Sequence, residues 1–378
     1  MPTSTETRIV RNPLVDRAAV PAADDRSAAF HRQLPGWAPT PLQAAPTAAL
    51  ALGVASVQVK DESSRLAMPS FKILGASWAS YRALLAHLGD DAPTGEVTLA
   101  ELRSALGPRP VTLVAATDGN HGRAVARMAS LLGLAAIILV PRDMVTARRE
   151  AIRAEGADLR VVDGGYDDAI DASAALADAE HVVISDTSWE GYTEVPRWVI
   201  DGYGTLTGEI LTDLELITPT VVAAQIGVGA FAAAIARGFA GGPARLLVGV
   251  EPTLADCVTV SIAQGHPVTI PGPQNSSMAG LNCGTPSVTA WADVSRGFDT
   301  FVTVDDSDTE DAMRLLAADG IASGESGAAG LAGLLRHREG LGLGPDDHVL
   351  VVSTEGPTDP VNYERVCGFA PVSHLEEA

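Results

Sequence analysis

Short apolar runs alternate with amphipathic stretches along most of this chain of 378 residues. Runs rich in Val, Ile, Leu and Ala predict buried strands at 57–62, 111–117, 135–141, 158–163, 182–186, 220–226, 245–252, 300–305 and 347–354. Amphipathic stretches between them predict helices, among them 72–89, 121–133, 146–156 and 166–180. Residues 1–50 lack this alternation, and we expect them to wrap the body of the protein as an arm.

Continuous apolar strands separated by helices are typical of parallel sheets that are covered by helices on both faces. The pattern therefore predicts an α/β fold built from βαβ units in two layers rather than a barrel. Ligands of such sheets bind beyond the carboxyl ends of the strands. The residues that directly follow the predicted strands are thus the first candidates for function.

Composition narrows the classes of partner. A net charge of -21 and a pI near 4.6 disfavour nucleic acid and anionic membranes as partners. The start, MPTSTETRIV, has no signal-peptide pattern, and no apolar run approaches the ~20 residues of a membrane span, so we expect a soluble, cytoplasmic protein. Cys257, Cys283 and Cys367 are too few for a disulfide framework or a zinc cluster, and no metal site is expected. A Cys257–Cys283 bridge stays open.

Lysine is scarce in this chain. Lys60 and Lys72 are the only two lysines, against 24 arginines, and both lie in one short segment. A lysine amine can lose its proton and form a Schiff base with a carbonyl, whereas a guanidinium stays charged and cannot. Codon preference explains the scarcity but not the place of the two lysines. Any covalent amine chemistry has only these two candidates.

Three polar segments follow predicted strands. ATDGNHG (116–122) suits a capped turn before a helix, or an anion site at the start of that helix. GVGAF (227–231) also opens a helix, and its glycines would let backbone N–H groups approach a phosphate. The same loop matches a dinucleotide fingerprint, because Glu251 ends the next strand where a ribose-binding acid would lie. STEG (353–356) ends the last apolar strand.

Together, ATDGNHGR, DTSWEGY, GVGAF and STEGPTDP resemble the diaminopropionate ammonia-lyase family of fold-type II, tryptophan synthase β-like pyridoxal phosphate enzymes. The likeness extends from about Lys60 to Asp359. It implies a two-domain α/β fold of parallel-rich sheets covered by helices, with pyridoxal 5'-phosphate as cofactor. We expect a large cofactor-binding domain of residues 1–94 plus 199–378, a small mobile domain of residues 95–198, and a homodimer.

The resemblance also implies roles for the residues that hold the cofactor. Lys72 matches the family lysine that binds the cofactor as a Schiff base, and Lys60 would be structural. Asn120 matches the residue that hydrogen-bonds the 3′-oxygen of the ring. Ser353, or alternatively Thr354, would face the ring nitrogen. The phosphate loop, with backbone amides as donors, is Gly227, Val228, Gly229, Ala230 and Phe231.

Asp118 stands where related hydroxyamino-acid dehydratases carry a small hydroxyl residue, as the resemblance implies. Its charge would repel the substrate carboxylate unless a second amino group on the substrate offsets that repulsion. We expect Lys72 to take the α-proton of the L isomer and Asp118 that of the D isomer. Asp186 would hold or protonate the β-amino group, or alternatively cap a turn. Thr117, Asp118 and His121 are candidate substrate contacts, although His121 also suits packing at a helix start.

The resemblance thus implies α,β-elimination of 2,3-diaminopropionate to pyruvate and two ammonia, by a small-molecule enzyme. A serine or threonine dehydratase remains the close alternative. An NAD-binding oxidoreductase that uses Gly227 and Glu251, and a non-catalytic cofactor-binding protein, are alternatives of other classes. Met68-Pro69-Ser70 before the lysine and Ala76 after it depart from the family pattern. These departures weaken the substrate assignment more than the cofactor assignment.

Overall fold

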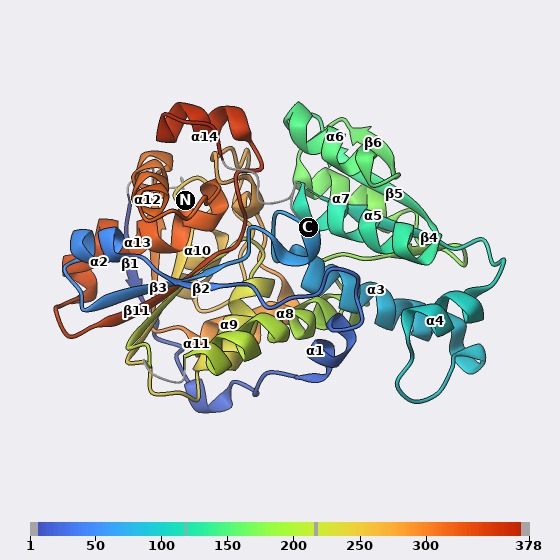
Figure 1. The fold of residues 1–378 in the computed structure, drawn as a ribbon, viewed down its shortest axis with the longest axis horizontal. Coiled ribbons are helices and arrows are strands. Elements are labelled where there is room, and N and C mark those ends of the chain that lie inside the picture. The colour runs from blue at the N-terminus through green and yellow to red at the C-terminus, as the bar shows by residue number, and fades with distance from the viewer. Residues whose placement is uncertain (1–6, 118, 215–217, 372–378) are drawn as a thin grey trace. The chain divides into compact units, whose positions relative to one another are not determined.

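The computed structural model describes residues 7–117, 119–214 and 218–371, which form two compact units (Figure 1). The first unit comprises Met1–Ala23, Pro39–Phe71 and Leu206–Ala378, and the second comprises Asp24–Ala38 and Lys72–Thr205. Residues 24–38, 72–94 and 199–205 thus belong to the second unit, whereas the sequence-based division assigned them to the large domain. That division stays a prediction, because compactness does not test which part binds a cofactor or moves.

The first unit contains a seven-stranded sheet. Its five central strands are parallel, and the edge strands β1 and β2 are antiparallel to their neighbours. In order across the sheet they are β1 (Ile9–Arg11), β10 (Thr300–Val304), β9 (Leu246–Pro252), β8 (Val221–Gln225), β11 (His348–Ser353), β3 (Ser56–Asp61) and β2 (Leu42–Ala44). Both edge strands come from the segment predicted to be an arm. Each has three residues, too few to show a periodic pattern.

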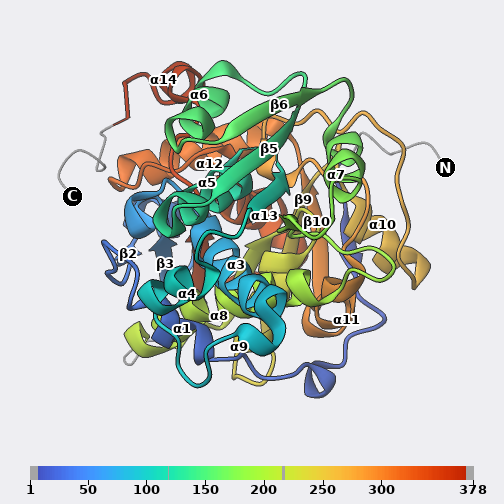
Figure 2. The ribbon, with the colours of Figure 1, turned by 90° about the vertical axis from the view of Figure 1, so that its right-hand side faces the viewer.

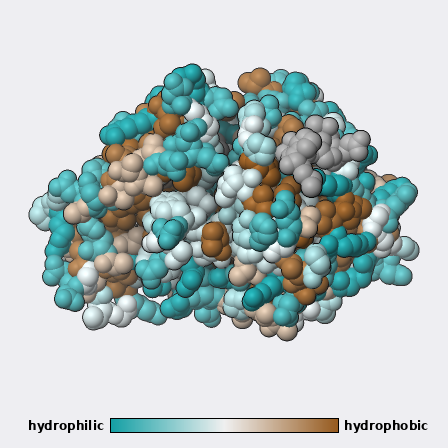
Figure 3. All heavy atoms as spheres, turned by 180° about the vertical axis from the view of Figure 1, so that it is seen from behind, coloured by the Kyte–Doolittle hydropathy of each residue, from teal (hydrophilic) through white to brown (hydrophobic). Residues whose placement is uncertain are grey.

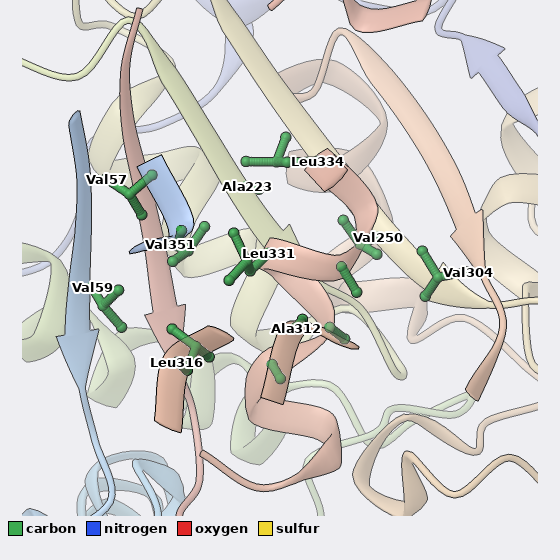
Figure 4. Packing of buried hydrophobic residues seen from close by; sticks show 14 of the residues in the cluster. Val57, Val59, Ala223, Val250, Val304, Ala312, Leu316, Leu331, Leu334 and Val351 are labelled. Atoms are coloured by element: carbon green, nitrogen blue, oxygen red, sulfur yellow. The ribbon is translucent and has the colours of Figure 1, made fainter. Parts of the chain in front are cut away.

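Helices cover the first sheet on both faces. Leu331 and Leu334 of α13 pack against valines of the strands, such as Val250 and Val351, and against Leu316 of α12 (Figure 4). The strand side chains that point to the opposite face of the sheet are buried as well, which explains why the strands are apolar throughout. The helices of this unit are α2 (Pro46–Leu52), α9 (Ala230–Phe239), α10 (Cys257–Gln264), α11 (Val288–Gly297), α12 (Asp306–Ala318), α13 (Glu325–Leu341) and α14 (Pro360–Cys367).

The second unit contains a four-stranded, fully parallel sheet (Figure 2). Its order is β6 (Asp158–Val162), β5 (Ala135–Pro141), β4 (Thr112–Ala116) and β7 (His181–Val183). Strand β7 ends three residues earlier than the sequence predicts. The helices are α1 (Arg26–His31), α3 (Lys72–Leu88), α4 (Leu99–Leu106), α5 (Asn120–Leu132), α6 (Thr146–Ala154), α7 (Tyr166–Ala174) and the first part of α8 (Glu194–Asp213).

The predicted α/β class with parallel-rich, helix-covered sheets is confirmed by these two sheets. Hydrophilic side chains are spread over the face in Figure 3, with hydrophobic ones between them. Within the described ranges, no helix is both long and apolar enough to cross a membrane. The same ranges contain no group of three or more His, Cys, Asp or Glu side chains that could hold a metal ion.

Candidate active site

Helix α3 begins at Lys72, and two glycines fix how this helix packs in the second unit. A Cβ on Gly75 would lie 2.5 Å from the Cε1 atom of Tyr203 in α8. A Cβ on Gly202 would lie 2.5 Å from the backbone oxygen of Leu74. Only glycine fits at either position, so α3 and α8 approach closely along this line. This contact holds the first turn of α3, and with it Lys72, in a defined place.

Lys72 pairs with the carboxylate of Asp186. The Nζ atom donates to Oδ2 at 2.7 Å, with 18% of the lysine side chain and 5% of the aspartate side chain exposed. Burial by itself would raise the pKa of Asp186, but the charge of Lys72 above all, together with His121 and the hydrogen bonds from Lys72 and Tyr166, outweighs it and holds that pKa well below its usual range. Asp186 is therefore an ionised, nearly buried carboxylate beside a partly exposed amine.

Tyr166, at the start of α7, donates its hydroxyl hydrogen to Oδ1 of Asp186 at 3.1 Å. The ring of Tyr166 packs against the hydrophobic core of the second unit. Both oxygens of Asp186 are thus engaged, one by the amine and one by the phenol. This contact could not be predicted from the sequence, because an aromatic residue at the start of an acidic helix has no chemical signature of its own.

His121 in α5 is buried beside this pair. Its Nε2 atom lies 2.8 Å from the backbone oxygen of Ile184, so Nε2 carries the hydrogen and Nδ1 is an acceptor. Nδ1 has no hydrogen-bond partner within the described chain. Burial lowers the pKa of His121 and favours the neutral ring, against the opposing charge of Asp186. His121 therefore supports the backbone before Asp186, and a substrate contact for it stays a prediction.

The turn between β4 and α5 holds the other predicted residues of this unit. Asn120 is the first residue of α5, and Gly119 before it has a φ of 149°, a conformation that favours glycine. Thr117 is fully buried, and its Oγ1 accepts a hydrogen bond from the Gly119 N–H at 2.9 Å. Asp118 lies outside the described residues. The substrate roles of Thr117 and Asp118 and the ring contact of Asn120 stay predictions.

The loop between β8 and α9, Gly227 to Phe231, lies in the first unit. A Cβ on Gly227 would lie 3.0 Å from the backbone oxygen of Gly280, and Gly229 has a φ of 106°. The Val228 oxygen accepts a hydrogen bond from Ser287 N at 2.8 Å, which ties the loop to the segment before α11. These contacts require glycine at both positions.

This loop fits a phosphate group. Within the described chain, the backbone N–H groups of Val228, Gly229 and Ala230 have no hydrogen-bond acceptor, and they precede or open a ten-residue helix. Free amides and the positive end of a helix dipole both favour an anion. The missing Cβ atoms leave the backbone open to close approach. The loop therefore suits the phosphate of a cofactor such as pyridoxal phosphate.

Ser353 ends strand β11 in the first unit and is buried. Its hydroxyl donates to Oγ of Ser323 at 2.8 Å. The neighbouring Thr354 accepts a hydrogen bond from Nε2 of Gln225 at 2.8 Å. Both hydroxyls thus belong to a buried polar network at the end of this strand. The assignment of Ser353 rather than Thr354 to a ring nitrogen stays a prediction.

Glu251 does not serve as the ribose-binding acid that the dinucleotide alternative requires. The side chain is fully buried, and it accepts hydrogen bonds from the N–H groups of Val258 and Thr259 and from the Thr259 hydroxyl, at 2.9, 2.6 and 2.6 Å. Burial raises its pKa to about 8. Glu251 therefore caps the first turn of α10. Cys257 lies in that turn, and within the described residues no disulfide joins it to Cys283 or Cys367.

Comparison with known proteins places this arrangement in a family. Residues 34–355 match the family model described as pyridoxal-phosphate dependent enzyme. The chain is 37% identical to diaminopropionate ammonia-lyase of Escherichia coli strain K12 over 357 residues, covering 89% of each chain. It is 35% identical to the same enzyme of Salmonella typhimurium strain LT2, covering 89% of this chain and 90% of that one. A crystal structure of the Escherichia coli enzyme in complex with D-serine matches with a TM-score of 0.87 at 34% identity, covering 96% and 97% of the two chains.

Proposed function

The chain belongs to the diaminopropionate ammonia-lyase family of pyridoxal-phosphate dependent enzymes, and from this we propose that it cleaves 2,3-diaminopropionate to pyruvate and two molecules of ammonia. The reaction is an α,β-elimination, in which the Cα proton and the β-amino group leave the substrate. Within the chain, the observation that carries the proposal is the Asp186 carboxylate, 2.7 Å from the amine of Lys72.

Pyridoxal 5'-phosphate is the cofactor, and when bound it draws electrons from Cα and so makes loss of the Cα proton feasible. Lys72 is the residue that holds it covalently. Lys60 is excluded from that role because its amine is completely buried and bonded to acceptors of its own unit. The amides of Gly227 to Phe231 would bind the phosphate, with Asn120 and Ser353 at the ring.

Lys72 and Asp186 control protons at the reacting carbons. Lys72 accepts the Cα proton of the L isomer, since an amine beside a carboxylate can both lose and regain a proton during the cycle. Asp186 is ionised and nearly buried, so it can bind a substrate ammonium group when Lys72 is engaged with the cofactor. Its negative charge keeps that β-amino group protonated, and the group then leaves as neutral ammonia with the electron pair of the C–N bond. Asp118 would accept the Cα proton of the D isomer.

The same carboxylate supports the choice of substrate. A β-ammonium group would donate a charge-assisted hydrogen bond to Asp186, whereas a β-hydroxyl would not bring a charge to match the carboxylate. This difference favours diaminopropionate over serine and threonine. Removing the charge should narrow the preference, because both substrate types would then meet a neutral group.

The deciding experiment measures pyruvate release from L- and D-2,3-diaminopropionate, serine and threonine under one set of conditions. We expect kcat/KM to be highest for diaminopropionate and to fall by about 100-fold in Asp186→Asn, as for loss of a general acid or base. The ratio of diaminopropionate to serine turnover should fall as well. Faster turnover of serine or threonine by the wild-type enzyme would make it a dehydratase. Bound cofactor without turnover of any amino acid would indicate a binding protein.

A homodimer and a cytoplasmic location complete the proposal. The dimer is what the resemblance of the motifs to the family implies, whereas the location is an expectation from the sequence pattern. Light scattering of the purified holoenzyme measures the first, since a dimer has twice the chain mass of 39.0 kDa. Fractionation of the source cells measures the second.

A further inference from the structure

The backbone that carries Asp186 lies beyond the end of a strand. Regular pairing of β7 with β4 ends at Val183, which lies opposite Val114. Ile184, Ser185 and Asp186 follow, and each is buried, with 0%, 1% and 4% of its surface exposed. Buried backbone N–H and C=O groups require hydrogen-bond partners. Beyond Val183 a neighbouring strand no longer supplies partners for all of these backbone groups, so other groups must supply them.

Side chains supply the missing partners. The hydroxyl of Tyr192 donates to the backbone oxygen of Val183 at 2.7 Å and accepts from the N–H of Ser185 at 3.1 Å. His121 donates to the oxygen of Ile184 at 2.8 Å. The N–H of Ile184 continues to the oxygen of Val114 at 2.7 Å. One phenol hydroxyl therefore bridges the two residues on either side of Ile184.

The ring of Tyr192 is itself held in place. It stacks on Trp189, with ring centroids 4.1 Å apart and planes inclined by 8°. The backbones of the two residues also bond to each other, from Tyr192 N to Trp189 O at 3.0 Å and from Trp189 N to Tyr192 O at 3.4 Å. Burial raises the pKa of Tyr192 well above its usual value, so the hydroxyl keeps the hydrogen that it donates.

We propose that Tyr192 is a positioning residue for Asp186, acting through the backbone of Val183 to Ser185. The hydroxyl of Tyr192 contacts the backbone of Val183 and Ser185, whereas the carboxylate of Asp186 bonds directly to Lys72 and Tyr166. The proposal rests on the proposed function, in which Asp186 binds the β-ammonium group and keeps it protonated until it leaves. Tyr192, the last residue of DTSWEGY, thus fixes the position of the Asp186 carboxylate.

The test compares Tyr192→Phe with Tyr81→Phe, a matched loss of one hydroxyl elsewhere in the second unit. Tyr81 lies in α3 within an aromatic cluster with Phe30 and Trp78, and its hydroxyl meets the backbone of Val97. Tyr192→Phe keeps the stacked ring and removes only the bridge. We expect it to lower kcat/KM by at least about 10-fold, and Tyr81→Phe to lower it by less than about twofold.

A double-mutant cycle separates positioning from general loss of structure. If Tyr192 acts through Asp186, adding Tyr192→Phe to Asp186→Asn should lower kcat/KM by less than about twofold more. If the hydroxyl merely supported the unit, the full effect would persist in that background and the proposal would be overturned. The rates are measured with whichever amino acid the wild-type enzyme converts fastest, so the result does not depend on diaminopropionate being the substrate.

Amide hydrogen exchange of the folded holoenzyme gives a readout without activity. The Ser185 amide should exchange slowly in the wild type and in Tyr81→Phe, and at least about 10-fold faster in Tyr192→Phe. Equal exchange in all three proteins would show that the hydroxyl does not hold this backbone and would overturn the proposal, even if Tyr192→Phe were inactive. A wild-type enzyme that ignores diaminopropionate but shows the expected exchange contradicts the proposed function and not the role of Tyr192.

Discussion

The two lysines lie in different units and in opposite kinds of surroundings. Lys60, in β3, is completely buried, and its amine lies 2.7 Å from the oxygen of Thr40, 2.8 Å from Glu209 and 3.4 Å from Asp213. Lys72 opens a helix, is partly exposed, and meets the carboxylate of Asp186. Three acceptors match the three hydrogens of an ammonium group, so the amine of Lys60 is fully occupied.

Lys60 belongs to a larger buried ionic network. Arg65, also fully buried, donates to Glu62 at 2.7 Å and to Glu209 at 2.6 Å, so Glu209 joins the two cations. Such networks stabilise a fold only while every member is paired. In the proposed function Lys72, by contrast, exchanges partners during turnover. The two residues of one rare type thus serve unrelated purposes in this chain, one structural and one chemical.

Replacing Lys72 should produce the largest effect. Lys72→Ala removes the amine that we propose to hold the cofactor, so we expect turnover to fall by more than about 1,000-fold, as for loss of a residue that forms the covalent link. The visible absorption of the bound cofactor should vanish with it, and so should the change that borohydride produces. Lys60→Met is the matched control, in which the absorption band should persist. A band retained in Lys72→Ala and lost in Lys60→Met would reverse the assignment of the two lysines.

Lys60→Met should instead affect stability. It leaves two carboxylates of the network, Glu209 and Asp213, without their shared cation, and we expect the free energy of unfolding to fall by about 3 kcal/mol. Denaturant unfolding measures this change, with activity per folded molecule as the second readout. Glu209→Gln should cost less stability when added to Lys60→Met than in the wild type, because Glu209 then keeps only its pair with Arg65. A stability equal to that of the wild type would mean that the network contributes nothing.

The motifs made it possible to predict the chemical role of Lys72 from the sequence. The residues that each lysine contacts could not be predicted in this way. Lys72, GVGAF and DTSWEGY follow or open regular elements, and the pattern of apolar runs located those elements to within a few residues. The contacts of Lys60 with Glu209 and of Asp186 with Tyr166 join residues 149 and 20 positions apart in the chain. Periodicity carries no information about such distant pairs. The edge strands β1 and β2 escaped prediction because three residues cannot show a period.

The pH dependence of stability tests whether the ionic network around Lys60 stabilises the fold through its charges. Burial by itself would raise the pKa of Glu209, but the hydrogen bonds and charges of Arg65 and Lys60 together outweigh it and hold the pKa below its ordinary value of 4.5. A depressed pKa contributes stability that is present above pH 4.5 and is lost as the pH falls through the folded-state pKa. Glu209→Gln should therefore lower the free energy of unfolding by about 2 kcal/mol at pH 7. The difference from wild type should shrink below pH 4.5.

Glu310→Gln is the control for this measurement, since Glu310 forms its ion pairs with the partly exposed Arg314 and Arg365. We expect a change below about 1 kcal/mol for such surface pairs. Urea unfolding at a series of pH values between 3 and 8 measures both variants. A Glu209→Gln effect that stayed constant across the series would show that ionisation of Glu209 is not what stabilises the fold.

The smallest effect tests whether the two lysines are independent. Leu66 and Ala67 lie between them and have φ values of 52° and 55°, a left-handed conformation that is costly for residues other than glycine. Ala67 is exposed, so Ala67→Gly should relieve strain without loss of packing and raise the free energy of unfolding by about 0.5–1 kcal/mol. Ala92→Gly, at an ordinary φ of −67°, should lower it slightly.

Turnover of Ala67→Gly then decides the question. Arg65, in the same short helical turn, forms ion pairs with Glu62 and Glu209. The network around Lys60 therefore holds the strained residues, which precede Lys72 in the chain. Strain kept by its surroundings often serves a nearby site. If it serves Lys72, kcat should fall in Ala67→Gly while stability rises, and Ala92→Gly should leave kcat unchanged. Unchanged kcat in both variants would leave the ionic network as a purely structural device, separate from the chemistry of Lys72.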